Sequence, residues 1–240
     1  GLQGEGETIA ILDTGADYRN CYLAEVEGKT PPVYQGTNPG PPDLSQRKVV
    51  AYNMLYSPDD PADGVLAFDN QGHGTYVAGN AAGSNLEFPF GTADDVENGV
   101  APAAKLIIQD AGFHGRDDCA DLAALGCPVI DITPMLEQAY FQGARLHNNS
   151  WGDRENFFPQ NTYTAVCADM DEMTWRYPDF LFCIAAGNDG GRGEDTVGSP
   201  ATAKNVLAVG ATETGNFESI TSFSSLGWTS DGRIKPDVYA

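Results

Sequence analysis

Short apolar runs alternate along the chain with segments of helical periodicity. Five runs rich in Ile, Val, Leu and Ala are almost continuously hydrophobic, which is typical of strands covered on both faces; they span residues 8–12, 48–52, 104–108, 180–185 and 205–209. Three helix-like segments lie between them, at residues 74–82, 134–144 and 163–176. This order predicts an α/β fold with a mainly parallel sheet and helices on both faces. With no internal repeat or clear boundary, residues 1–240 are predicted to form one domain.

The charge of the chain is strongly negative. It has 34 acidic and 13 basic residues among 240, a formal net charge of −21. Nucleic acid and anionic membranes are repelled by such a surface, so neither is expected as a partner. The acidic excess has three interpretations: a solvated surface, calcium-binding loops, or adaptation to salt. No apolar run approaches the ~20 residues that span a bilayer, and a secretory leader is expected to have been removed or not included.

The five cysteines favour an oxidising compartment. Cys119 and Cys127 bracket a short segment, as in a loop closed by a disulfide, whereas no pairing can be assigned to Cys21, Cys167 and Cys183. The spacings do not fit a zinc site. The alternative is that all five are buried thiols of a cytosolic protein. We predict a Cys119–Cys127 disulfide and a secreted or extracellular protein.

Polar clusters follow two of these apolar runs, at residues 13–15 and 185–190, and a third cluster, at residues 148–152, follows the short apolar step at residues 145–147. Ligands of open α/β sheets bind beyond the carboxyl ends of the strands, so these clusters are candidate site segments. A glycine-rich turn at residues 187–191 suits phosphate binding equally well, although no Gly-Lys-Ser/Thr signature accompanies it. The fold pattern alone therefore does not choose a reaction.

Several ordered blocks resemble the subtilisin-like serine peptidases, or subtilases. The resemblance extends over nearly the whole chain and rests on residues 9–15, 72–79, 99–106, 149–152, 185–188, 197–201, 209–212, 223–225 and 235–237. It implies a peptidase acting on protein or peptide substrates, with no catalytic cofactor and with structural calcium. One departure is Tyr76, which stands where the family often has a second histidine.

The resemblance assigns roles to individual residues. Asp13 is expected to orient His73, and His73 to act as the general base that takes a proton from a serine nucleophile. Asn188 is expected to donate to the oxyanion, the alternative being an asparagine in a left-handed turn. The main chain of Ser150, Trp151 and Gly152 is expected to pair with an extended substrate, which binds as an added strand. The substrate is also expected to contact Ala186 and Gly187. The glycines beside His73 are expected to leave room for the substrate backbone.

The nucleophile of the family is missing from these blocks. Ser224, Ser225 and Ser230 lie in the wrong sequence context, and His114 and His147 match no catalytic block. We therefore expect the serine downstream of residue 240 or on a second chain, and the 240 residues alone to be inactive. The alternative function is that of a non-catalytic, subtilase-like binding protein.

Overall fold

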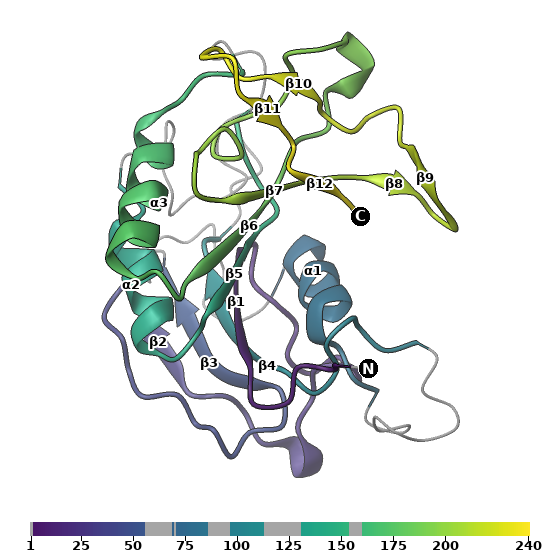
Figure 1. Cartoon of the computed structure of the whole chain (residues 1–240). Helices are drawn as coiled ribbons and strands as arrows, with labels where there is room; N and C mark the ends of the chain where they lie inside the picture. The colour runs from purple at the N-terminus through teal and green to yellow at the C-terminus, as the bar shows by residue number, and fades with distance from the viewer. Residues whose placement is uncertain (1, 56–68, 70, 86–96, 113–130, 154–159) are drawn as a thin grey trace. The chain divides into compact units, whose positions relative to one another are not determined.

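The computed structural model describes residues 2–55, 69, 71–85, 97–112, 131–153 and 160–240 (Figure 1). The chain divides into two compact units. Unit 1 comprises Gly1–Cys127 and Pro134–His147, and unit 2 comprises Pro128–Thr133 and Asn148–Ala240. The chain passes from unit 1 to unit 2 within strand β5 (Leu146–Asn149).

Unit 1 is built on a parallel sheet in which the strand order is β2-β3-β4-β1. Its elements are β1 (Thr8–Asp13), η1 (Val26–Gly28), β2 (Val33–Gln35), β3 (Val49–Met54), α1 (His73–Ala82), β4 (Lys105–Asp110) and α2 (Thr133–Phe141). The register places Asp13 opposite Asp110, and Asp110 opposite Met54 of β3. Three strands therefore end together at the carboxyl edge of this sheet.

Helices cover both faces of the sheet of unit 1. Ile108 of β4 packs in a buried cluster with Ala78 and Ala82 of α1, whereas the next residue, Gln109, donates a hydrogen bond to the carbonyl oxygen of Met135 in α2. Because successive side chains of a strand point to opposite faces, α1 and α2 lie on opposite sides of β4. The prediction of a mainly parallel sheet with helices on both faces is confirmed here.

Buried amide side chains attach α2 to the sheet. Asn53 and Gln142 exchange two hydrogen bonds, of 2.7 and 2.9 Å. Gln109 donates to Gln138 Oε1 at 2.9 Å and contacts His147 Nε2 through its own oxygen at 2.9 Å. All five side chains are at most 3% exposed, so these hydrogen bonds satisfy groups that water cannot reach. His147 is thus a structural histidine, in agreement with its position outside the catalytic blocks.

Unit 2 contains a parallel sheet with the strand order β6-β7-β12 and one long helix, α3 (Ala165–Arg176). The strands are β6 (Leu181–Ala185), β7 (Leu207–Gly210) and β12 (Val238–Tyr239), with the antiparallel pairs β8 (Thr212–Glu213) with β9 (Asn216–Ile220) and β10 (Gly227–Trp228) with β11 (Ile234–Lys235). A 3-10 turn, η3 (Gly190–Arg192), follows β6.

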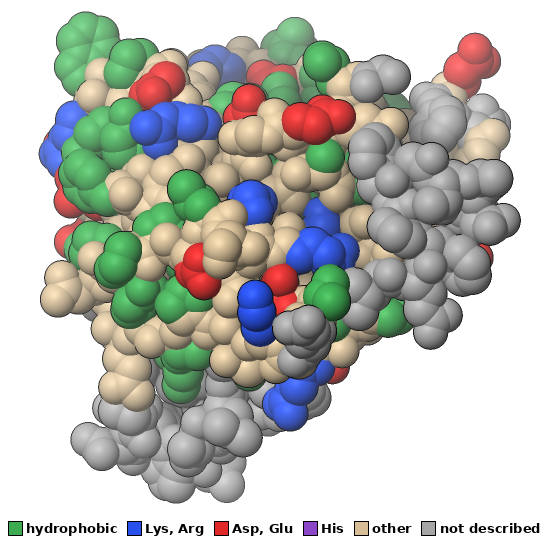
Figure 2. Space-filling model, turned by 90° about the horizontal axis from the view of Figure 1, so that it is seen from below, with side chains coloured by type: hydrophobic (Ala, Val, Ile, Leu, Met, Phe, Trp, Pro, Cys, Tyr) green, Lys and Arg blue, Asp and Glu red, His purple; other side chains and the backbone are tan. Residues whose placement is uncertain are grey.

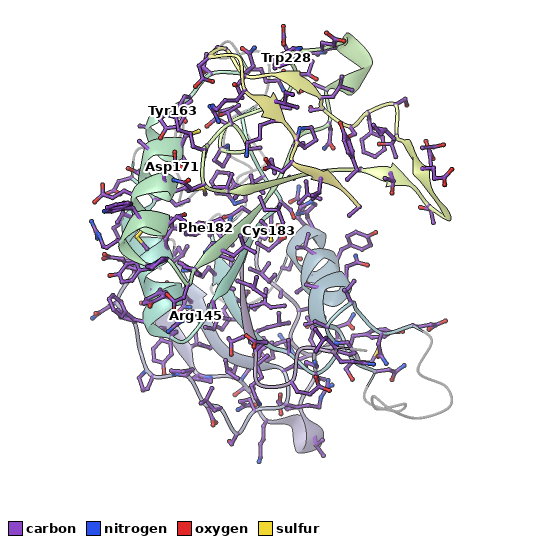
Figure 3. All side chains as sticks on the ribbon, viewed as in Figure 1. Arg145, Tyr163, Asp171, Phe182, Cys183 and Trp228 are labelled. Atoms are coloured by element: carbon purple, nitrogen blue, oxygen red, sulfur yellow. The ribbon has the colours of Figure 1, made fainter. Side chains whose placement is uncertain are left out.

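One carboxylate anchors α3. Asp171 accepts hydrogen bonds from the backbone amides of Lys204 and Asn205, and from the Tyr163 hydroxyl at 2.7 Å. Figure 3 shows Asp171 and Tyr163 close together at this helix. Desolvation, followed by the hydrogen bond to Asp171, raises the pKa of Tyr163. The Tyr163 hydroxyl therefore stays protonated and keeps donating to the carboxylate.

The structure confirms all five predicted strands and all three predicted helices, with changed ends. The first helix begins one residue early, at His73, and the third begins two residues late, at Ala165. Strands not predicted are short, such as β2 and β5. Neither β2 nor β5 has the continuous apolar run of the strands that were predicted.

Lys and Arg side chains lie among Asp and Glu side chains on the face seen from below Figure 1 (Figure 2). The acidic excess therefore does not make that face uniformly negative. No helix in the described part of the chain has the length and apolar character needed to cross a membrane.

Candidate active site

Asp13 and His73 meet at the carboxyl edge of the sheet of unit 1. Asp13 is the last residue of β1, and His73 is the first residue of α1. Asp13 Oδ1 lies 2.7 Å from His73 Nδ1, the distance of a charge-assisted hydrogen bond. The contact expected from the sequence is therefore present, although 60 residues separate the two side chains along the chain.

The two side chains differ in exposure. Asp13 is 2% exposed, whereas the His73 side chain is 48% exposed. Asp13 Oδ1 also accepts the Thr14 amide at 2.8 Å, and Oδ2 is buried without a hydrogen bond from the described residues. A buried carboxylate on one ring nitrogen fixes the tautomer of the imidazole and stabilises its protonated form. The arrangement suits a general base.

The turn after Asp13 is held from beneath by β3 and β4. The Tyr52 hydroxyl donates to Asp110 Oδ2 at 2.7 Å and accepts the amide of Ala16 at 3.1 Å. Gly15 has a φ of +100°, and a Cβ there would lie 2.7 Å from the Tyr52 hydroxyl oxygen. Only glycine suits both the backbone conformation and the space. The sequence interpretation did not identify this buried Tyr52–Asp110 pair.

The two glycines beside His73 have different purposes. Gly72 has a φ of +86°, and a Cβ on it would meet no atom within 4 Å. A Cβ on Gly74 would lie 2.0 Å from the carbonyl oxygen of Gly15. The expectation that both glycines leave room for a substrate is therefore wrong for Gly74, because the Asp13 turn already fills that space.

Asn188 follows β6 in unit 2 and is exposed. Its side-chain amide has no hydrogen-bond partner among the described residues. The left-handed residue of this turn is Gly187, with a φ of +115°, and Asn188 does not have a positive φ. The alternative interpretation of Asn188 as a left-handed turn residue is therefore wrong. An exposed amide at the end of a parallel strand is available to a ligand.

Two backbone amides of the turn around Asn188 donate to acceptors within the protein. The amide of Asp189 donates to Ser225 Oγ at 3.0 Å, and that of Gly190 donates to the carbonyl oxygen of Phe223 at 2.9 Å. A phosphate-binding loop presents such amides to its ligand. Because both are already bonded within the protein, the phosphate-loop alternative is not supported.

Two of the serines excluded as nucleophiles are buried. Ser225 is 0% exposed, and its amide donates to the carbonyl oxygen of Gly187 at 3.0 Å. Ser224 is 1% exposed, and its hydroxyl accepts the amide of Ala211 at 2.9 Å. Both hydroxyls support backbone turns. Ser230 is exposed and lies within a different turn.

The segment Ser150–Gly152 continues from β5 without strand pairing. The amide of Asp153 donates to the carbonyl oxygen of Ser199 at 2.8 Å, and the amide of Gly198 donates to that of Ala186 at 3.1 Å. Residues 198–199 thus connect the Ser150–Gly152 segment with the Ala186–Asn188 turn. Within unit 2, the expected substrate-binding residues are held by one common segment.

Some expectations fall outside the described residues. These are the Cys119–Cys127 disulfide and His114. Cys21, Cys167 and Cys183 are free thiols. In the described part of the chain no group of three or more His, Cys, Asp or Glu side chains is placed to hold a metal ion. The described carboxylates therefore do not by themselves provide a calcium site.

Comparison with known proteins agrees with the geometry. Residues 4–240 match the subtilase family. The chain is 31% identical over 214 residues to the serine protease/ABC transporter B family protein tagD of Dictyostelium discoideum, covering 89% of this chain and 10% of that protein. It is 29% identical over 250 residues to bacillopeptidase F of Bacillus subtilis (strain 168), covering 100% of this chain and 15% of that protein.

A solved structure extends the likeness to the fold. The prenylagaramide maturation protease PagA superposes with a TM-score of 0.53 at 23% identity, over 94% of this chain and 60% of that chain. This chain spans between a tenth and about a seventh of the length of the two curated relatives. The fold, the ordered blocks and the family match lead to one conclusion: this chain belongs to the subtilase family of serine proteases.

Proposed function

We propose that this chain carries the Asp and His of the catalytic triad of a serine endopeptidase. Asp13 orients the imidazole, and His73 takes the proton of the serine hydroxyl as it attacks the peptide carbonyl. His73 then returns that proton to the leaving amine. The observation that carries the proposal is the 2.7 Å contact between the buried Asp13 carboxylate and Nδ1 of the half-exposed His73 ring.

Asn188 is the proposed oxyanion donor. Its exposure and its lack of a partner among the described residues support this role. A side-chain amide that is already fixed to a neighbour has to break a bond before it stabilises the developing charge. The segment Ser150–Gly152, unpaired as a strand, is proposed to bind the extended peptide substrate beside Ala186 and Gly187.

The proposed nucleophile is a serine outside residues 1–240, on a downstream segment or a second chain. Ser224 and Ser225 support turns, which makes both poor candidates. The alternative, a non-catalytic binding protein, needs no buried carboxylate directed at an imidazole. Endopeptidase activity is therefore the better proposal.

Four further properties belong to the proposal. The protein is secreted or extracellular, with a Cys119–Cys127 disulfide. It requires no catalytic cofactor, and calcium stabilises the fold. Since the described carboxylates do not cluster at metal-binding spacing, calcium ligands would have to include backbone carbonyls or residues outside the described ranges.

The test uses the full-length protein that contains these residues. Hydrolysis of a quenched fluorescent peptide library and labelling by a fluorophosphonate are measured for the unmodified protein and for Asp13→Asn, His73→Gln and Asn188→Ala. We expect kcat to fall by at least roughly 10⁴-fold for the first two variants. For Asn188→Ala we expect a fall of about 10²–10³-fold, the size known for an oxyanion donor of this family.

Asn80→Ala provides the matched control for Asn188→Ala. Asn80 is an exposed asparagine of α1 whose side chain donates only to the carbonyl oxygen of Tyr76 among the described residues. The Asn80→Ala variant should hydrolyse the peptide library at the same rate as the unmodified protein. A folded full-length protein that binds peptides without cleaving them or reacting with the phosphonate would support the binding-protein alternative.

A further inference from the structure

A third carboxylate lies next to the Asp13–His73 pair and was not identified from the sequence. Asp69 is 5% exposed and stands four residues before His73. Its two oxygens accept five hydrogen bonds of 2.7 to 3.1 Å. A buried carboxylate with this many donors is a fixed part of the structure.

Four of the donors belong to the start of α1. Asp69 Oδ1 accepts the amides of Gln71 and Gly72, at 3.1 and 2.7 Å. Asp69 Oδ2 accepts both the amide and the hydroxyl of Thr75, each at 2.7 Å. The formal N-cap, Gly72, has no side chain to satisfy these amides. Asp69 therefore fixes the backbone on both sides of His73.

The fifth donor belongs to the Asp13 turn. The Thr14 hydroxyl lies 2.9 Å from Asp69 Oδ1 and 3.3 Å from Asp13 Oδ1, so its single proton goes to Asp69. The same hydroxyl accepts the amide of Gly74 at 2.9 Å. The Thr14 amide in turn donates to Asp13 Oδ1 at 2.8 Å. One residue thus bonds to Asp13, to Asp69 and to α1.

We infer that Asp69 is a positioning residue that holds the Asp13 carboxylate and the His73 ring at their 2.7 Å contact, acting on the Asp13 side through Thr14. The inference rests on the proposed function. Asp69 does not touch the reacting atoms. A residue that only capped α1 would need no contact with the Asp13 turn, whereas Asp69 joins the two segments that carry the pair.

The chemistry requires a carboxylate at this position. All five groups around Asp69 donate, and an ionised carboxylate is an acceptor at both oxygens. In Asp69→Asn one carboxylate oxygen is replaced by an NH₂ group, which cannot accept a hydrogen bond. This NH₂ group faces either the two donors of Thr75 or the donors of Gln71, Gly72 and Thr14. The variant therefore loosens one of the two attachments without a change in side-chain size.

Thr14 allows the two attachments to be separated. Thr14→Val keeps the shape of the side chain and leaves the four bonds from Asp69 to Gln71, Gly72 and Thr75 in place. It removes the hydroxyl that donates to Asp69 and accepts the amide of Gly74. Thr14→Ser returns a hydroxyl at the same position. If Asp69→Asn folds poorly, Thr14→Val still tests the link to Asp13.

The experiment measures kcat, KM and melting temperature of the full-length protein with these three substitutions. It also follows the low-field proton resonance of the hydrogen-bonded His73 Nδ1–H, assigned by its loss in His73→Gln. We expect roughly 10- to 100-fold lower kcat for Asp69→Asn and Thr14→Val, the cost of an ångström-scale misplacement, with little change in KM. The Nδ1 proton should move upfield, and Thr14→Ser should recover most of the kcat lost in Thr14→Val.

Asp171→Asn is the matched control. Asp171 likewise accepts two backbone amides and a hydroxyl, but within unit 2. The Asp171→Asn variant should have a lower melting temperature and an unchanged His73 Nδ1–H resonance. If Asp69→Asn and Thr14→Val behave in the same way, the inference is overturned. An unmodified protein without peptidase activity would overturn the proposed function instead, and the Nδ1 resonance of the variants would still decide the role of Asp69.

Discussion

The carbonyl oxygen of Gly15 occupies the place where a side chain on Gly74 would begin, 2.0 Å from an ideal Cβ. A Cβ there would also lie 3.1 Å from the Cβ of Asp13. The first turn of α1 and the turn after β1 are therefore in direct backbone contact, and that contact brings His73 to Asp13.

Gly74→Ala should push α1 away from the Asp13 turn. The obstacle is a backbone carbonyl, which cannot rotate away as a side chain can. We expect a lower melting temperature together with a loss of peptidase activity of roughly 100-fold or more, because the Asp13–His73 contact lengthens. Thermal unfolding and kcat of the full-length protein give the two measurements.

Gly79→Ala, in the same helix, is the control. A Cβ on Gly79 would meet nothing within 4 Å. Replacing a helical glycine by alanine should raise the stability by about 0.5–1 kcal/mol and leave activity unchanged. Equal effects of the two substitutions would show that the contact with Gly15 does not matter.

Lys48 should make unit 1 more stable as the pH rises from about 7 to about 10.5. Lys48 is 2% exposed, and its ammonium group donates to the carbonyl oxygens of Pro102 and Ala104. Desolvation lowers the pKa of Lys48 to about 7, Arg47 and Lys105 add to the decrease, and Glu25 opposes it. Between pH 7 and 10.5 the unfolded chain binds more protons at this group than the folded chain, so stability rises with pH.

Lys48→Met tests this pH dependence. The free energy of unfolding is measured by denaturant titration between pH 6 and 11 for both proteins. The free energy of unfolding of the unmodified protein, relative to that of the variant, should rise by at most about 1.4 kcal/mol per pH unit, and only between pH 7 and 10.5. A difference that stays constant across the window would contradict the lowered pKa.

Ser225→Ala should not remove the nucleophile. The Ser225 hydroxyl is buried and accepts the amide of Asp189, so its loss leaves that amide without a partner and costs about 1–3 kcal/mol of stability. The full-length variant should still react covalently with a fluorophosphonate, as intact-mass measurement would show. A folded variant that no longer reacts would identify Ser225 as the nucleophile.

Calcium should raise the melting temperature of the protein, as the family resemblance implies. Melting is compared in millimolar calcium and in excess chelator, with magnesium at the same ionic strength as the control. Magnesium should not substitute, because it demands a smaller octahedral site. Identical melting temperatures in calcium and in chelator would remove calcium from the proposal.

The sequence predicts β1 and Asp13 together, because a continuous apolar run ends directly in an acidic turn. It also predicts α1, because a helix-like segment begins after the glycine-rich turn. The resemblance of residues 72–79 to a family block identifies His73 as the partner of Asp13. Asp69 could not be predicted in this way, since its bond to Thr14 spans 55 positions and one aspartate in an Asp-rich stretch resembles the next. The pattern shows where a strand ends, but not which distant side chains meet there.

The glycines beside His73 show the same limit. Gly72 and Gly74 are indistinguishable as letters, and only the position of the Gly15 carbonyl separates an open glycine from a filled one. Strands such as β10 and β11, of two residues each, likewise depend on pairing between segments and not on their own composition.

The buried amides of α2 determine the register in which this helix docks. Gln138 and Gln142 are one helical turn apart and face Gln109 and Asn53 respectively. Sliding the helix by a turn, about 5.4 Å, would put one glutamine in the other's place. When Gln138 takes the place of Gln142, Pro134 reaches the vacated position and Gln109 loses its side-chain partner. Apolar packing alone tolerates such a slide. The two amide pairings, Gln138 with Gln109 and Gln142 with Asn53, are therefore both formed in only one alignment of the helix on the sheet.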